Sequence, residues 1–162
     1  MVLVCVPTPT GTDGSADSSA VESCVDGLAE VLRPGSVVAV KSTVPVGTCR
    51  RISRRLAEVD VVTVSNPEFL REGHAVYDFC HPDRVVIGVP DGAHADRAAD
   101  MVARLYADDT DTILPMTLES AELSKYASNA FLAVKLSYVH AGRVERRRWR
   151  RHHRRHRLHG RR

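Results

Sequence analysis

The sequence lacks a long apolar run. No stretch approaches the roughly 18 apolar residues that a membrane-spanning helix needs. The apolar run Val2–Val6 has neither the basic flank nor the length of a signal peptide. We therefore expect a cytoplasmic protein that has no membrane partner.

Motifs that bind metals or phosphates are also missing. No GxGxxG turn, the usual pyrophosphate-binding motif, occurs in the sequence. The cysteines are too widely scattered to form a CxxC pair, so we expect reduced thiols and no metal site; they are Cys5, Cys24, Cys49 and Cys80.

Positive charge is scarce before residue 143 and dominates after it. Residues 1–142 carry 12 Lys and Arg against 19 Asp and Glu, whereas residues 143–162 carry 11 Arg against the single Glu145. The tail also holds four histidines and Trp149. Because such a tail would neutralise phosphates, sequence-independent nucleic-acid binding is one alternative function.

Short apolar runs alternate with helical spacing along the rest of the chain. Runs rich in β-branched residues predict buried, parallel strands at Met1–Val6, Val37–Val40, Val59–Val64 and Val85–Val89. Apolar spacing predicts helices at Ala20–Leu32, Thr48–Ala57 and Ala93–Tyr106, a short strand at Thr112–Leu114 and a long helix from Glu119. This alternation predicts an α/β fold with a doubly wound parallel sheet.

Ligands of such sheets bind beyond the carboxyl ends of the strands. Three predicted strands are followed there by loops rich in hydroxyl groups, Pro and Gly: Pro7–Gly11, Lys41–Thr48 and Ser65–Gly73. Gly47 and Thr48, at the start of a helix, are suited to an anion such as a pyrophosphate. Ordinary turn chemistry is the alternative for each loop.

Two residue pairs with four-residue spacing are candidates for chemistry. Glu68 and Glu72 would polarise water or hold hydroxyl groups, and a solvated surface is the alternative. Lys125 and Asn129 lie on one face of a predicted helix, where a cation and an amide would stabilise an oxyanion. An exposed structural helix face is the alternative for this second pair.

Five motifs, taken together, favour the functional interpretation of these loops and residue pairs over the structural one. They are VPTPTGTDGSAD, KSTVPVGT, SNPEFLREGHAVYDF, HPDRVVIG and ELSKYASNAFLAVKLSY, and they cover residues 1–138. In order and spacing this set resembles the UDP-glucose/GDP-mannose dehydrogenase family, and within it the bacterial UDP-glucose 6-dehydrogenases. The resemblance implies the second half of a Rossmann-type sheet followed by a long linking helix.

The resemblance also implies an activity within nucleotide-sugar metabolism and polysaccharide biosynthesis. Members of the family use NAD to oxidise the primary alcohol of UDP-glucose to the carboxylate of UDP-glucuronate in two hydride transfers. NAD is implied to contact Val6, Pro7, Thr8, Pro9, Thr10, Ser42, Thr43, Val44 and Glu72. The nucleotide sugar is implied to contact Glu68, Phe69, Leu70, Arg71, Glu72, Lys125 and Asn129.

Four of these residues have implied catalytic roles. Thr43 orders a water, Glu68 acts as the general base that hydrolyses a thioester intermediate, and Lys125 and Asn129 stabilise the oxyanion. Residues 1–162 do not contain the family's GxGxxG unit, its catalytic cysteine motif or its UDP-binding domain. We therefore expect the chain alone to be inactive. A non-catalytic binding or assembly module is the other alternative.

The expected organisation has three parts. Residues 1–117 form a partial NAD-binding domain, residues 118–142 begin the linking helix where family members form homodimers, and residues 143–162 form an aberrant, disordered tail. A shifted reading frame would explain the tail, and an evolved extension is the alternative.

Overall fold

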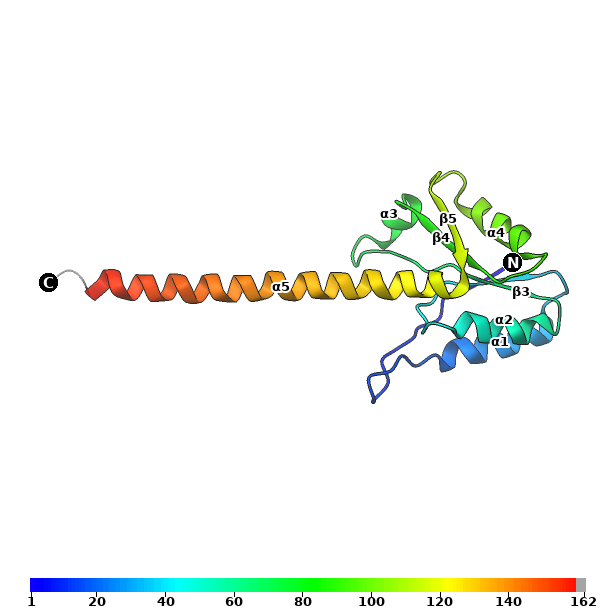
Figure 1. Ribbon diagram of the computed structural model, residues 1–162, viewed down its shortest axis with the longest axis horizontal. Helices are drawn as coiled ribbons and strands as arrows, with labels where there is room; N and C mark the ends of the chain where they lie inside the picture. Colours follow the sequence, from blue (N-terminus) through cyan, green and yellow to red (C-terminus); the bar gives the residue numbers. More distant parts are fainter. Residues whose placement is uncertain (160–162) are drawn as a thin grey trace. The chain divides into compact units, whose positions relative to one another are not determined.

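The computed structural model describes residues 1–159. The chain forms two compact units, Met1–Tyr126 and Ala127–Arg162. The first unit holds a five-stranded sheet in the order β1-β2-β3-β4-β5 (Figure 1). The strands are β1 (Val2–Val4), β2 (Val37–Val40), β3 (Val62–Ser65), β4 (Val85–Val89) and β5 (Ile113–Thr117). The predicted α/β class with a long final helix is therefore confirmed.

Each of the five strands lies parallel to at least one neighbour, but one junction differs. β1, β2 and β3 are parallel, and so are β4 and β5, whereas β3 and β4 pair antiparallel at Ser65 and Gly88. The expectation of a wholly parallel sheet is wrong because residues 66–84 form no crossover helix that packs on the sheet. This segment holds only the short helix α3 (Ala75–Cys80), which has no buried residue.

Helices cover the two faces of the sheet (Figure 1). They are α1 (Ser19–Val31), α2 (Thr48–Ala57), α4 (Ala95–Ala103) and the 3-10 turn η1 (Arg104–Tyr106). Side chains of α1 and α2, including Val25 and Ile52, form one core cluster with the strands. Side chains of α4, including Val102, form the other. The predicted helices thus occur where apolar residues recur every three or four positions.

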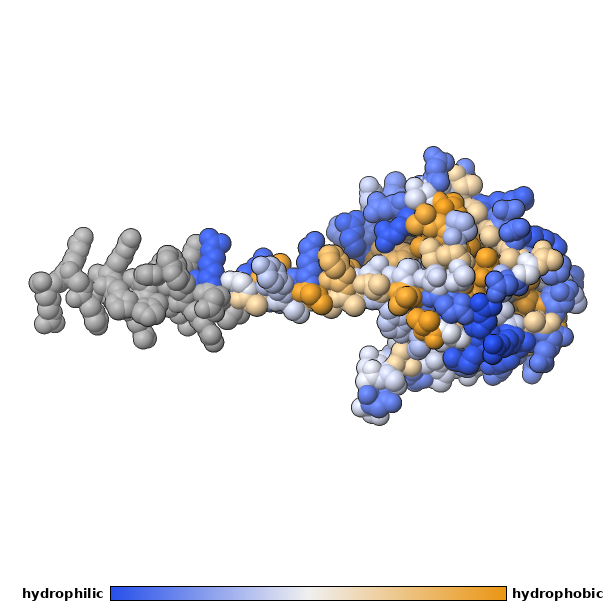
Figure 2. Space-filling model, in the orientation of Figure 1, coloured by the Kyte–Doolittle hydropathy of each residue, from blue (hydrophilic) through white to orange (hydrophobic). Residues whose placement is uncertain are grey.

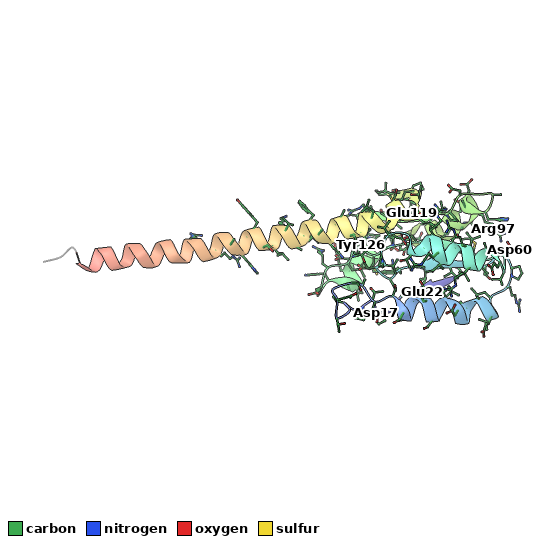
Figure 3. The ribbon with its side chains drawn as sticks, turned by 60° about the horizontal axis from the view of Figure 1, so that its bottom comes forward. Asp17, Glu22, Asp60, Arg97, Glu119 and Tyr126 are labelled. Carbon is green, nitrogen blue, oxygen red and sulfur yellow. The ribbon has the colours of Figure 1, made fainter. Side chains whose placement is uncertain are left out.

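Ion pairs join α1 and α2 along their exposed sides. Glu22 of α1, labelled in Figure 3, accepts hydrogen bonds from Arg51 and Arg55 of α2. Arg55 also pairs with Asp26. Exposed pairs of this kind contribute little individually, so the apolar cluster beneath them supplies most of the stabilisation.

The helix α5 (Leu118–His159) begins in the first unit and forms the second. Its first two turns belong to the first unit because Leu118, Ala121 and Lys125 are buried there. The unit boundary therefore follows Tyr126, whereas the domain boundary expected from the sequence follows residue 117. No helix among the described residues is long and apolar enough to span a membrane.

Part of the basic tail lies within α5. Residues 143–159 continue α5, since arginine is a good helix former and no Gly or Pro lies between these positions. Residues 160–162 lie outside the described residues, as do most side chains to which nucleic-acid binding was attributed. Further towards its start, α5 exposes several apolar side chains (Figure 2): Phe131, Leu132, Val134, Leu136, Tyr138 and Val139.

Candidate functional site

The loops that follow β1 and β2 are tied together at the carboxyl edge of the sheet. The Thr8 hydroxyl donates to the carbonyl oxygen of Thr43 over 2.8 Å. The Ser42 hydroxyl donates to the carbonyl oxygen of Val6 over 2.6 Å. Four of the residues predicted to contact a cofactor are therefore brought together by direct hydrogen bonds.

The remaining residues of these two loops differ in exposure. Pro7, Pro9 and Thr10 are exposed, which leaves the outer side of the first loop open. The side chain of Val44 is instead in the core, where it is 3% exposed. Only the backbone of Val44 is therefore available for the predicted ligand contact, because the side chain is packed in the core cluster with α2.

The Glu68 carboxylate and the Lys125 ammonium form an ion pair. Glu68 lies in the loop after β3, and its Oε1 is 2.9 Å from Lys125 Nζ on α5. Its Oε2 accepts the N–H of Leu70 over 2.5 Å. The Lys125 side chain is 7% exposed and that of Glu68 is 31% exposed. The structure thus brings together two residues that the sequence placed on separate elements.

The charge of Glu68 is set by opposing effects. Partial burial by itself would raise its pKa, but hydrogen bonds from Lys125 and Leu70, with the positive charges of Lys125 and Lys41, hold the pKa below its usual value. Glu68 is therefore a carboxylate at neutral pH. A carboxylate beside a buried ammonium forms a polar pair that a hydroxyl-bearing ligand would contact.

Phe69 lies between two cations. Its ring centroid is 4.7 Å from the Arg84 guanidinium and 5.4 Å from Lys125 Nζ. Arg71, two residues later, is exposed and engaged by Asp78, with Nη2 2.6 Å from Oδ1. Phe69 therefore helps to position Lys125, whereas the Nε and Nη2 groups of Arg71 donate to Asp78 of α3.

Glu72 and Asn129 are the other polar residues predicted at the site. Glu72 is exposed, and its side chain makes no hydrogen bond or ion pair with the other side chains that the structure describes, which are those of residues 1–143 and 146. Asn129 is an exposed residue of α5 that falls in the second compact unit. The structure thus pairs Glu68 with Lys125, and the roles of Glu72 and Asn129 stay predictions.

A polar network that was not predicted from the sequence lies at the same edge. Lys41 Nζ donates to the Tyr106 hydroxyl over 3.0 Å, and that hydroxyl donates to Asn66 Oδ1 over 2.8 Å. The Asn66 amide in turn donates to the carbonyl oxygen of Val86. Lys41 and Asn66 each follow a strand directly, and that position was the available clue to their place at this edge.

The start of α2 is occupied by a side chain of the protein. Glu122 accepts the N–H of Gly47 over 2.6 Å and the N–H of Cys49 over 2.7 Å. The sequence indicated that Gly47 and Thr48 suit an anion such as a pyrophosphate, and in the structure the anion at this helix N-terminus is a carboxylate from α5. Glu122 was not predicted from the sequence, since its partners are backbone groups far away along the chain.

A comparison with known protein families identifies the family of this chain. Residues 1–109 match the model described as "UDP-glucose/GDP-mannose dehydrogenase family, NAD binding domain". The chain belongs to this family. The matched region contains every strand-end loop described above and Glu68, while Lys125 lies beyond it on α5.

Individual dehydrogenases give the same result. UDP-glucose 6-dehydrogenase from Pseudomonas aeruginosa is 43% identical over 150 residues, which is 86% of this chain and 32% of that protein. The UDP-glucose dehydrogenase structure from Pyrobaculum islandicum is 43% identical with a TM-score of 0.73, over 84% of this chain and 32% of that one. A ternary complex of GDP-mannose dehydrogenase from P. aeruginosa is 30% identical with a TM-score of 0.76, over 85% and 33%.

The chain spans only part of these dehydrogenases. It covers 16% of an uncharacterised protein from Methanocaldococcus jannaschii that is 42% identical over 144 residues. It covers about a third of the other relatives named here. The matched domain is the NAD-binding domain of this dehydrogenase family, so NAD is the cofactor of this domain.

The geometry of the dehydrogenase edge fits part of a dinucleotide site. Hydrogen bonds from Thr8 and Ser42 hold the first two loops side by side, with the outer side of Pro7–Thr10 open. A preformed, exposed backbone of this kind suits an extended ligand that lies across the strand ends. The start of α2 does not take part, because Glu122 fills it.

Cys49 does not have the environment of an activated thiol. Cys49 is fully buried, and burial followed by the nearby charge of Glu122 raises the pKa of its thiol far above the usual value. Cys5 and Cys80 are exposed. Among residues 1–143 and 146, whose side chains the structure describes, no group of three or more His, Cys, Asp or Glu residues is placed to hold a metal ion.

Proposed function

We propose that residues 1–117 form the second half of the NAD-binding domain of a UDP-glucose 6-dehydrogenase. Such an enzyme converts UDP-glucose to UDP-glucuronate. The observation that carries the proposal is the Glu68–Lys125 pair beside the two joined cofactor loops. The sequence holds neither a GxGxxG turn nor the cysteine motif of the family. By themselves, residues 1–162 are therefore proposed not to turn over.

Lys125 is proposed to stabilise negative charge on the sugar oxygen as it develops. Its ammonium is nearly excluded from water, where a fixed cation acts on a developing oxyanion more strongly than in bulk solvent. Glu68 is proposed to take a proton from the water that hydrolyses the last intermediate, a role that needs an ionised carboxylate. Asn129 is proposed to assist Lys125, and Thr43 to order that water.

The ion pair links these two proposed roles. While Lys125 neutralises Glu68, the carboxylate is a weak base because its pKa is held low. An oxyanion that draws the ammonium towards itself would leave Glu68 without its partner, and its pKa would rise. Glu68 would then become a stronger base at the stage when a water must lose its proton.

NAD is proposed to lie across the loops Val6–Thr10 and Ser42–Val44, with Glu72 reaching it from the third loop. When bound, NAD supplies a hydride acceptor. The contribution of the chain is to hold the two loops in register through the Thr8 and Ser42 hydroxyls. Phe69, Leu70 and Arg71 are proposed to line the side of the site that receives the nucleotide sugar.

A chimera tests this proposal. Residues 1–138 would replace the matching segment of the P. aeruginosa UDP-glucose 6-dehydrogenase, which supplies the parts not present here. NAD reduction with UDP-glucose should be followed at 340 nm. We expect activity in the chimera and a loss of roughly 100-fold or more in kcat in its Lys125→Met and Glu68→Gln variants.

Leu114→Ser provides a matched control, because Leu114 is an exposed residue of β5 and does not belong to any of these loops. It should leave kcat within about two-fold of the parent chimera. A folded chimera without activity, or one in which Lys125→Met remains fully active, would contradict the proposed function.

The exposed apolar side chains of α5 favour a second copy of the chain as partner. Phe131 is 67% exposed, Val134 68% and Tyr138 81%. Apolar side chains that recur along a helix and remain exposed are typical of an interface. We propose a homodimer formed through this helix. Sedimentation velocity should show a dimer that dissociates when Phe131 and Val134 are both changed to Ser, and a monomeric parent chain would refute it.

A further inference from the structure

The first turns of α5 contact two separate segments of the NAD-binding domain. Glu119, labelled in Figure 3, accepts hydrogen bonds from the Arg50 guanidinium of α2. Glu122 accepts backbone N–H groups at the start of α2. Lys125 reaches Glu68 in the loop after β3. The same short stretch of helix therefore holds both the end of the second loop and the third loop.

Glu122 is the most buried of these charged residues, at 2% exposed. A buried carboxylate is costly unless its oxygens accept hydrogen bonds. Here each oxygen accepts one N–H, from Gly47 and from Cys49, at distances typical of strong, charge-assisted bonds. The partial positive charge of the α2 N-terminus adds to this stabilisation. Glu122 is therefore an anchor that fixes α5 against α2.

Glu122 and Lys125 are three residues apart, so their side chains project from the same face of α5. The contacts that fix Glu122 therefore also fix the rotation of α5 about its axis, and its position along that axis, at Lys125. We propose that Glu122 is a positioning residue for this dehydrogenase: by anchoring α5 to the start of α2, it holds Lys125 against Glu68 and in register with the loop that contains Thr43. Its importance for the reaction rests on the proposed function, whereas its effect on the ion pair does not.

The titration of Glu68 in the full 162-residue chain tests this inference. Carbon-13 NMR would follow the Glu68 carboxyl without cofactor or substrate. Two positive charges act on that carboxyl, those of Lys125 and Lys41. Lys125→Met gives the reference, because it removes the closer charge completely and raises the midpoint.

Glu122→Ala should raise the Glu68 midpoint by most of the shift seen in Lys125→Met, because α5 loses its anchor and the ammonium moves away. The sign is decisive. Removal of the negative charge of Glu122 by itself would lower the Glu68 midpoint, since a nearby negative charge disfavours ionisation of a carboxyl group. Glu122→Asp keeps the charge but is one methylene too short to reach both N–H groups, so it should raise the midpoint by a smaller amount.

Glu119→Gln is the matched control. It removes a carboxylate from the same helix but leaves the anchor at Gly47 and Cys49 intact, so the Glu68 midpoint should not rise. If Glu122→Ala does not fold, Glu122→Asp decides the question alone. An unchanged or lowered midpoint in the folded Glu122 variants would overturn the inference, even if the chimera is active. A raised midpoint would support it, even if the chimera is inactive.

Discussion

Gly88→Ala should destabilise the NAD-binding domain. Gly88 lies in β4 where the sheet meets the start of α5, and a Cβ there would be 2.6 Å from Ala121 Cβ and 3.0 Å from the carbonyl oxygen of Thr117. Neither neighbour is a flexible side chain, so the backbone of α5 must move. Overpacking of this kind costs about 1–3 kcal/mol. For a domain of this size we expect Tm to fall by roughly 3–15 °C in a thermal unfolding experiment.

Gly27→Ala is the matched control for this experiment. Gly27 lies within α1, and a Cβ at this position would meet nothing within 4 Å. Replacing glycine in the interior of a helix stabilises it by about 0.5–1 kcal/mol, so the same substitution should here raise Tm. In the double variant Gly88→Ala/Ala121→Gly the shortest contact is removed, and part of the loss should be recovered. A Tm for Gly88→Ala at or above that of the parent chain would refute the reasoning.

Two further outcomes follow from hydrogen-bonded side chains. The Arg71 guanidinium and backbone N–H lower the pKa of Asp78 to about 2, so the stability due to this contact is present above pH 4 and is lost as pH falls towards 2. Carboxyl NMR should give that midpoint, with Arg71→Gln moving it upward; an unchanged midpoint would contradict the assignment. Tyr106→Phe removes a donor to the buried Asn66 and should lower the free energy of unfolding by about 1–3 kcal/mol in urea, while an unaffected midpoint would show that the network contributes nothing.

Much of the fold could be predicted because its cores are built from local patterns. Strand β2 (Val37–Val40) and helix α2 (Thr48–Ala57) have the predicted bounds. In α2, Ile52 and Leu56 lie four residues apart and are both fully buried, so the sequence period directly reflects the core face. Helix α3 was not predicted, because none of its residues is buried and it therefore has no apolar period.

The candidate site was predictable only where single residues carry the chemistry. Glu68 and Lys125 were singled out by their type and by the motifs around them, and the structure places them in contact. Glu122 was missed since its partners are the N–H groups of Gly47 and Cys49, which every sequence provides. For the same reason the expected anion at the start of α2 could not be recognised as an internal side chain.

The contacts at the start of α5 also limit where the chain can change length. Each added residue rotates a helix by about 100° and advances it by about 1.5 Å. A single insertion between Glu122 and Lys125 would therefore turn the Lys125 ammonium away from Glu68, or the Glu122 carboxylate away from α2, because both cannot keep their present contacts. Residues 11–15 lie in a largely exposed loop and are under no such constraint. Insertions and deletions among related sequences are therefore expected in that loop and not between Glu122 and Lys125.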